Sequence, residues 1–171
     1  DKARESLGLC PQFDVIWKLL SVRGHLELYC RLKGLTDTKL IDSEVAMFLK
    51  DLDLEDKADY PAGKLSGGQK RCLSCSIALI GGSKTVVLDE PTSGMDPEKR
   101  RLTWNLLAKH RAGRTILLTT HFMDEADLLG DRIAIMSHGK LSCAGSSLEL
   151  KKQFGSGYRL TVSKNTLPGS T

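Results

Sequence analysis

Two adjacent carboxylates, Asp89 and Glu90, follow a short apolar run in this 171-residue chain. The run Thr85–Leu88 is continuous and rich in β-branched residues, which is typical of a strand buried in a parallel sheet. A carboxylate beside such a strand is costly to bury unpaired. We therefore expect Asp89 to bind magnesium, directly or through water, and Glu90 to act as general base on an attacking water. The alternative is a strand that meets solvent with two ordinary acids.

A second chemical signal lies upstream, in the sequence Leu65-Ser66-Gly67-Gly68-Gln69-Lys70. Ser66 is expected to cap a helix that continues to Ile80. Consecutive glycines each cost about 1 kcal/mol relative to alanine inside a helix, so Gly67 and Gly68 indicate that another group approaches the backbone. A helix N-terminus offers free N–H groups and a positive dipole end to anions, and we expect a phosphate there, with Gln69 nearby. The alternative is that Ser66 only caps the helix.

His121 follows a second apolar run, Thr115–Thr120, which is also expected to form a buried strand. The carboxyl ends of neighbouring parallel strands face one crevice, so His121 is expected near Asp89 and Glu90. There it would contact a terminal phosphate or an attacking water. The alternative is a structural histidine, and His25, His110 and His138 receive no functional role.

Helical segments separate the expected strands, and the first strand is expected at residues 6–12. Residues 14–64 are predicted to form a helical subdomain, and residues 65–145 an α/β core with a parallel sheet. Residues 146–171 form the predicted C-terminal extension. The remaining predicted features are an apolar stripe on each of two helices (Leu26, Tyr29, Leu32; Ile41, Val45, Phe48, Leu49, Leu52), a helix at 97–110, one near 124–129, a hairpin turn at 137–140, a helix capped by Ser146 and a strand beginning within Tyr158–Val162.

Together these segments resemble the nucleotide-binding domain of ABC transporters. Further matches, at Cys10–Asp14, Leu118–Met136 and Gly139–Ser147, are similar to the A subfamily of lipid-handling transporters. The resemblance covers essentially the whole chain. It implies a partial P-loop NTPase (RecA-like) core with an inserted helical subdomain, and it implies ATP and Mg2+ as cofactors.

The resemblance also implies roles for individual residues and partners. Ser66–Gln69 match the signature motif, Asp89 and Glu90 the Walker B end, and His121 the switch histidine. Gln12 matches the Q-loop glutamine, which contacts magnesium and links the site to membrane domains. Asp96 matches the D-loop, which crosses to a partner domain. The implied partners are a second nucleotide-binding domain and transmembrane domains, at the cytoplasmic face of a membrane, with lipid as cargo.

One family motif is not found in the 171 residues: nothing fits G-x-x-x-x-G-K-[ST], the Walker A phosphate loop. We expect the chain to be a fragment of a longer protein. Since that loop supplies much of the grip on phosphate, the fragment alone should hydrolyse ATP negligibly. Lost strands and an open sheet edge should also make it poorly soluble.

Composition argues against several other functions. The formal charge of +4 is small and the basic residues are scattered, so no nucleic-acid partner is expected. Five unpatterned cysteines indicate a reducing compartment, and Cys72 and Cys75 are expected to be buried packing residues. Two alternatives stay open. One is a soluble ABC ATPase of DNA repair or translation, and the other is a non-catalytic truncated module that lends its signature motif to a partner's ATP.

Overall fold

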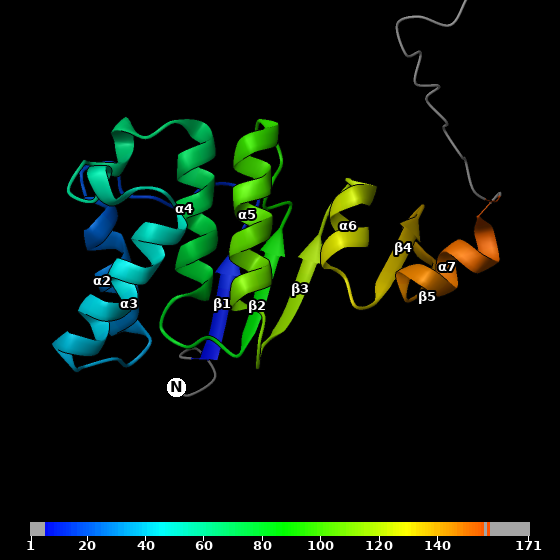
Figure 1. Ribbon diagram of the computed structural model, residues 1–171, viewed down its shortest axis with the longest axis horizontal. Coiled ribbons are helices and arrows are strands. Elements are labelled where there is room, and N and C mark those ends of the chain that lie inside the picture. Colours follow the sequence, from blue (N-terminus) through cyan, green and yellow to red (C-terminus); the bar gives the residue numbers. More distant parts are fainter. Residues whose placement is uncertain (1–5, 156, 158–171) are drawn as a thin grey trace, which may run out of the picture. The chain divides into compact units, whose positions relative to one another are not determined.

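Three short strands form a parallel sheet in the order β1-β2-β3 (Figure 1). The computed structural model describes residues 6–155 and residue 157. The strands are β1, Leu7–Cys10; β2, Thr85–Asp89; and β3, Thr115–Thr119. Because all three run in the same direction, their carboxyl ends lie at one edge of the sheet (Figure 1). The predicted parallel α/β core is confirmed.

Helix α4, Gly67–Leu79, packs on β1 and β2, and helix α5, Pro97–His110, lies beside α4. The cap of α4 is the one expected from the sequence. Ser66 Oγ accepts a hydrogen bond from the Gln69 N–H at 3.2 Å, and Gln69 Oε1 accepts one from the Ser66 N–H at 3.1 Å. This reciprocal pair is a capping box. It begins the helix at the residue after Ser66.

A pair of helices, α2 (Val22–Leu32) and α3 (Thr38–Asp51), packs together, and α2 also contacts α4. Two 3-10 turns follow at Glu55–Lys57 and Ala62–Lys64 and lead into α4. Their buried side chains are Val22, His25, Leu26 and Cys30 on α2, and Ile41, Val45, Phe48 and Leu49 on α3. The predicted stripe of α3 is confirmed. That of α2 is wrong at Leu32, which is 62% exposed because the buried face runs through residues 22, 26 and 30 instead.

The two faces of the sheet differ in what covers them. Val86 and Leu88 are fully buried on the face that α4 covers. The register aligns Leu9 with Val87 and Val87 with Leu117 in a row on the other face. Leu9 is 56% and Leu117 is 59% exposed. The prediction that β3 is buried on both faces is therefore wrong for the described residues, in which β3 is the last strand of its sheet.

The described residues divide into two units between Leu129 and Gly130, and α6 (Met123–Leu129) ends the first. The second unit contains the antiparallel strands β4, Ile133–Ser137, and β5, Lys140–Gly145. His138 and Gly139 have φ values of 49° and 74° at the turn between them, as a two-residue hairpin requires. The predicted hairpin is confirmed.

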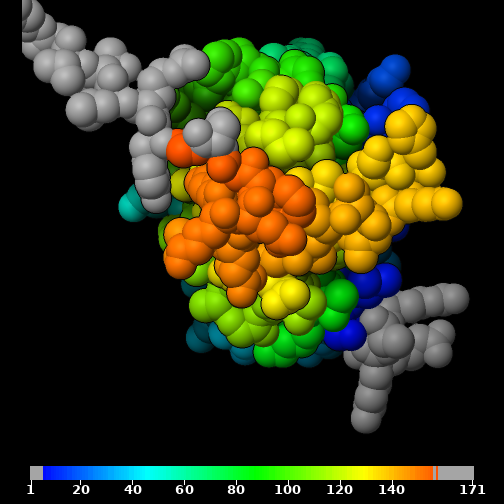
Figure 2. Space-filling view, turned by 90° about the vertical axis from the view of Figure 1, so that its right-hand side faces the viewer, coloured from blue at the N-terminus to red at the C-terminus, as the bar shows by residue number. Residues whose placement is uncertain are grey.

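Helix α7, Ser147–Phe154, follows β5 in the second unit, and its atoms lie against β5 (Figure 2). Ser146 caps α7 as predicted. The predicted strand within Tyr158–Val162 lies outside the described residues. Across residues 6–155 and 157, no helix combines the length and the apolar character needed to cross a bilayer.

Candidate functional site

Asp89, Glu90 and His121 meet at the carboxyl ends of β2 and β3. Thr119 joins the two strand ends, because its hydroxyl donates to Asp89 Oδ1 at 2.5 Å and accepts from the Glu90 N–H at 3.1 Å. The same N–H also lies 3.1 Å from the Thr119 carbonyl oxygen. His121 Nδ1 lies 3.3 Å from Glu90 Oε1. The expected convergence of these three residues is therefore observed.

Glu90 occupies a left-handed backbone conformation, with φ of 45°. This conformation is uncommon for a residue with a side chain, and it turns the chain directly after β2. The turn brings the second carboxylate oxygen, Oε2, to 3.4 Å from Gln12 Nε2. Gln12 and His121 thus approach the two oxygens of one carboxylate, from segments that follow β1 and β3. The Glu90 side chain is 28% exposed, so water can reach it.

The segment after His121 is fixed to the segment after Glu90 by a buried carboxylate. Glu125, on α6, is fully buried, and its Oε1 accepts hydrogen bonds from Thr92 Oγ1 at 3.0 Å and Trp104 Nε1 at 2.9 Å. The His121 ring itself is half exposed and lies 4.1 Å from the Phe122 ring. His121 therefore precedes a helix that is held by buried hydrogen bonds, while its own side chain is exposed to solvent.

The four signature residues lie at the start of α4. A Cβ placed on Gly67 would meet no atom within 4 Å, whereas one on Gly68 would lie 3.3 Å from Lys99 Cγ. The first N–H groups of a helix have no intrahelical acceptor. The backbone at Gly67 is therefore open to a ligand.

Asp96 has a structural task of its own in this chain. Its Oδ1 accepts from the Lys99 N–H at 2.9 Å and so caps α5. Asp96 Oδ2 would lie 3.9 Å from a Cβ on Gly68, so the starts of α4 and α5 are neighbours. The expected contact of Asp96 with a partner domain stays a prediction.

The donor set at the strand ends fits magnesium in chemical type. Asp89 offers a carboxylate, of which one oxygen is bound by Thr119. The amide nitrogen of Gln12 is turned to Glu90, which leaves the amide oxygen for a cation. Within the described part of the chain there is no group of three or more His, Cys, Asp or Glu side chains able to hold a metal. Magnesium would therefore take most of its ligands from water and a nucleotide, as it commonly does.

The cysteines on α4 are packing residues, as predicted. Cys72 and Cys75 are 1% and 0% exposed and contact different partners, Thr103 Oγ1 at 3.4 Å and Cys10 Sγ at 3.9 Å. Burial raises the pKa of the Cys72 thiol. The hydrogen bond between Cys10 and Cys75 lowers the pKa of the former and raises that of the latter.

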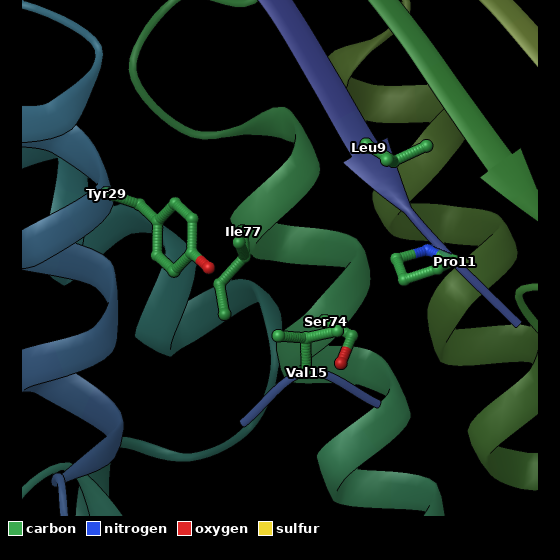
Figure 3. A pocket seen from close by; sticks show the side chains of 6 residues that line it. All are labelled: Leu9, Pro11, Val15, Tyr29, Ser74 and Ile77. Atoms are coloured by element: carbon green, nitrogen blue, oxygen red, sulfur yellow. The ribbon is translucent and has the colours of Figure 1, made fainter. Parts of the chain in front are cut away.

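A small pocket lies beside α4 (Figure 3). Its lining comes from β1 and the loop after it, from α2 and from α4. The lining residues are Leu9, Pro11, Val15, Tyr29, Ser74 and Ile77. None of them belongs to the predicted catalytic, magnesium or phosphate groups.

Sequence reasoning missed Thr119 and Arg71. Thr119 lay within a run interpreted as strand, and its hydroxyl is used only because β2 and β3 are in register. Arg71 is buried on α4 and donates mainly to backbone carbonyls at the carboxyl ends of β1 and β2. Backbone acceptors leave no residue pattern, so no sequence signal pointed to this arginine.

Comparison with known proteins gives consistent matches. The family model described as ABC transporter matches residues 1–93. The chain is 58% identical over 161 residues to the phospholipid-transporting ATPase ABCA3 of Mus musculus. The matched region covers 94% of this chain and 9% of that protein. The chain is 52% identical over 172 residues to ATP-binding cassette sub-family A member 2 of Rattus norvegicus. This match covers 100% of this chain and 7% of that protein. The chain thus spans less than a tenth of the length of these two relatives.

Solved structures show the same fold. An ATP-binding subunit of an ABC transporter matches 89% of this chain and 63% of its own, with a TM-score of 0.77 and 24% identity. A dimeric ATP-binding cassette in a post-hydrolysis state, bound to ADP and Pi, matches 85% of this chain and 65% of its own, with a TM-score of 0.74 and 25% identity. These matches confirm the predicted P-loop NTPase core.

Proposed function

Because this chain belongs to the ABC transporter family, and within it resembles the A subfamily, we propose that it forms part of a transporter's ATP-binding and ATP-hydrolysing domain. The observation that carries the proposal is the convergence of Gln12 and His121 on the Glu90 carboxylate, at 3.4 and 3.3 Å. Three separate segments supply these groups. A solvent-reachable carboxylate held by two polar side chains suits a general base.

In the proposed reaction, a water molecule attacks the terminal phosphorus of ATP and loses a proton to Glu90. The products are ADP and inorganic phosphate. His121 would hold the attacking water or the terminal phosphate. Asp89 and the amide oxygen of Gln12 are the proposed magnesium ligands, and the ion supplies charge neutralisation for the phosphates.

We propose further that two such domains pair head to tail. Ser66, Gly67, Gly68 and Gln69 would then contact ATP bound mainly by the partner, and Asp96 would lie at the same junction. Two observations support this arrangement: the open backbone at Gly67 and the dimeric state of a solved relative. A helix N-terminus with accessible N–H groups suits a phosphate.

Relatives that are named phospholipid-transporting ATPases support lipid as the cargo. The proposed partners are transmembrane domains of the same transporter, at the cytoplasmic face of its membrane. We propose no nucleic-acid partner. In this proposal residues 14–64 are the helical subdomain, residues 65–145 the core with its signature helix, and residues 146–171 a C-terminal extension.

Replacing Glu90 with glutamine in the full-length protein tests the proposal. Glu90→Gln should lower kcat for ATP hydrolysis by about 10²–10⁴ and preserve ATP binding. Glu55→Gln, at an exposed glutamate in the turn after α3, is the matched control and should change neither. The 171-residue chain alone should release no phosphate above background, since it contains no G-x-x-x-x-G-K-[ST] motif. Full hydrolysis by the Glu90→Gln protein would contradict the proposed role.

A further inference from the structure

Every N–H group of the Arg71 guanidinium faces an acceptor. The side chain is on α4 and its residue is only 5% exposed. A guanidinium has five N–H donors in one plane. The acceptors are the carbonyl oxygens of Pro91 (from Nε, 3.2 Å), Asp89 and Glu90 (from Nη2, 2.5 and 3.1 Å) and Pro11 (from Nη1), and the carboxylate of Asp14 (from Nη1, 3.5 Å).

These contacts hold the two segments that carry the Glu90 site. The Pro11 carbonyl belongs to the peptide bond that leads into Gln12. The carbonyls of residues 89–91 enclose Glu90 on both sides. Glu90 has a φ of 45°, and such a conformation persists only where the surroundings fix it. One planar group thus sets the backbone at Gln12 and at Glu90 together.

We infer that Arg71 is a positioning residue for hydrolysis, which holds the Glu90 carboxylate beside the Gln12 amide. The inference rests on the proposed role of Glu90 as general base. Arg71 lies about one turn from Ser66–Gln69 on the same helix. In the proposed pair of domains, α4 therefore connects the signature end, at one ATP, to the general base at the other ATP.

Lysine cannot replace this arginine. Its ammonium keeps the positive charge but is a compact group on a flexible stem, and it cannot span the carbonyls of two segments in one plane. Arg71→Lys therefore keeps the positive charge but removes the planar set of N–H donors, which we call the Arg71 fork. Arg71→Met removes both. Arg101→Met, at an exposed arginine on α5, is the matched control.

The measurements are kcat and KM for ATP, per folded active protein, in the full-length transporter. We expect Arg71→Lys and Arg71→Met to lower kcat about 10–100-fold, the cost of a misplaced catalytic group. KM should not change, because the acceptors of Arg71 are backbone carbonyls and the Asp14 carboxylate, and none of them is a proposed nucleotide contact. Arg101→Met should behave as wild type. A purely structural role would lower the amount of folded protein and leave kcat per folded site unchanged, and that result would overturn the inference.

A double-mutant cycle ties the effect to Glu90. In a Glu90→Gln protein, adding Arg71→Lys should have no further effect on kcat, because the positioned group is already lost. A further multiplicative loss would overturn the inference. If Glu90→Gln lowers kcat and Arg71→Lys does not, the inference fails and the proposed function stands. If Glu90→Gln leaves kcat unchanged, the proposed function fails, and the inference fails with it.

A milder variant covers the case in which the Arg71 variants do not fold. Asp14 Oδ1 accepts a hydrogen bond from Arg71 Nη1 at 3.5 Å and another from Ser74 Oγ at 3.2 Å. Asp14→Asn keeps the carbonyl contacts and removes the only carboxylate among the five acceptors. It should lower kcat about fivefold, as expected where a hydrogen bond to a charged acceptor becomes a weaker one to a neutral amide oxygen, with KM unchanged. An unchanged kcat in Asp14→Asn would then overturn the inference.

Discussion

His25 lies on α2 with both ring nitrogens engaged. Its Nε2 accepts from the backbone N–H of Trp17 at 3.0 Å, so Nδ1 carries the proton and donates to the Ser21 carbonyl at 2.8 Å. This pattern admits only the neutral ring, because a protonated imidazole has no acceptor. Burial lowers the pKa of His25 below its ordinary value of 6.5. These two hydrogen bonds give His25 a structural role between α2 and the segment before it.

The lowered pKa of His25 predicts a loss of stability in acid. Below pH 6.5 the unfolded chain binds a proton on His25 more readily than the folded chain, so the free energy of unfolding falls as pH falls. The loss is at most about 1.4 kcal/mol per pH unit. Melting temperatures from pH 7.5 to 5.5 should fall more steeply for wild type than for His25→Gln. Equal slopes would show that His25 titrates in the same way in both states.

At the scale of elements, two helices of this chain begin with the same capping box. Ser66 and Gln69 form it on α4, and Ser146 and Glu149 form it on α7. Between its two box residues α7 has Ser147 and Leu148, whereas α4 has two glycines. A cap of this type therefore needs no glycine. The two glycines of α4 need another explanation, and close approach of a phosphate provides one.

Gly67→Ala separates folding from function at this helix. The added methyl group meets no atom within 4 Å, and alanine favours a helix by about 1 kcal/mol relative to glycine. The variant should unfold at the same or a higher temperature, yet hydrolyse ATP more slowly in the full-length protein. Ser147→Ala, at the equivalent position of α7, should not change hydrolysis. Wild-type hydrolysis by Gly67→Ala would leave capping as the sole role of this motif.

Elements whose limits depend on neighbouring residues were predictable from the sequence. Helix α5 spans residues 97–110 as predicted, because Asp96 and Pro97 form a local start signal. Leu32 and Leu117 were predicted wrongly, because tertiary packing decides which face of α2 and of β3 is covered. The convergence at Glu90 was predictable from parallel strand ends. The Arg71 fork was not, because its partners are mainly backbone carbonyls far away in sequence.

At the scale of the molecule, the sheet exposes apolar side chains on the face opposite α4. Leu7, Leu9 and Leu117 are 44%, 56% and 59% exposed among the described residues, and the register places the last two in one row with Val87. Contiguous apolar surface of this kind, next to the edge strand β3, favours association with other chains.

The isolated 171-residue chain should therefore self-associate. Replacing Leu9 and Leu117 with lysine should reduce this association, since charges on a sheet oppose intermolecular pairing. The control is a double replacement with lysine at Leu32 and Leu40, which are 62% and 61% exposed but lie on helices; it should have little effect. Light scattering during size-exclusion chromatography measures the mass. A monomeric wild-type chain would contradict the prediction.

Helix α5 is anchored at both ends. At its last turn, Asp51 of α3 binds Lys109 Nζ at 2.6 Å and His110 Nε2 at 2.8 Å. At its first turn, Lys99 lies against Gly68 of the signature. The fourteen residues of α5 span about 21 Å. One continuous helix therefore joins the helix pair, at Asp51, to the signature residues at the start of α4.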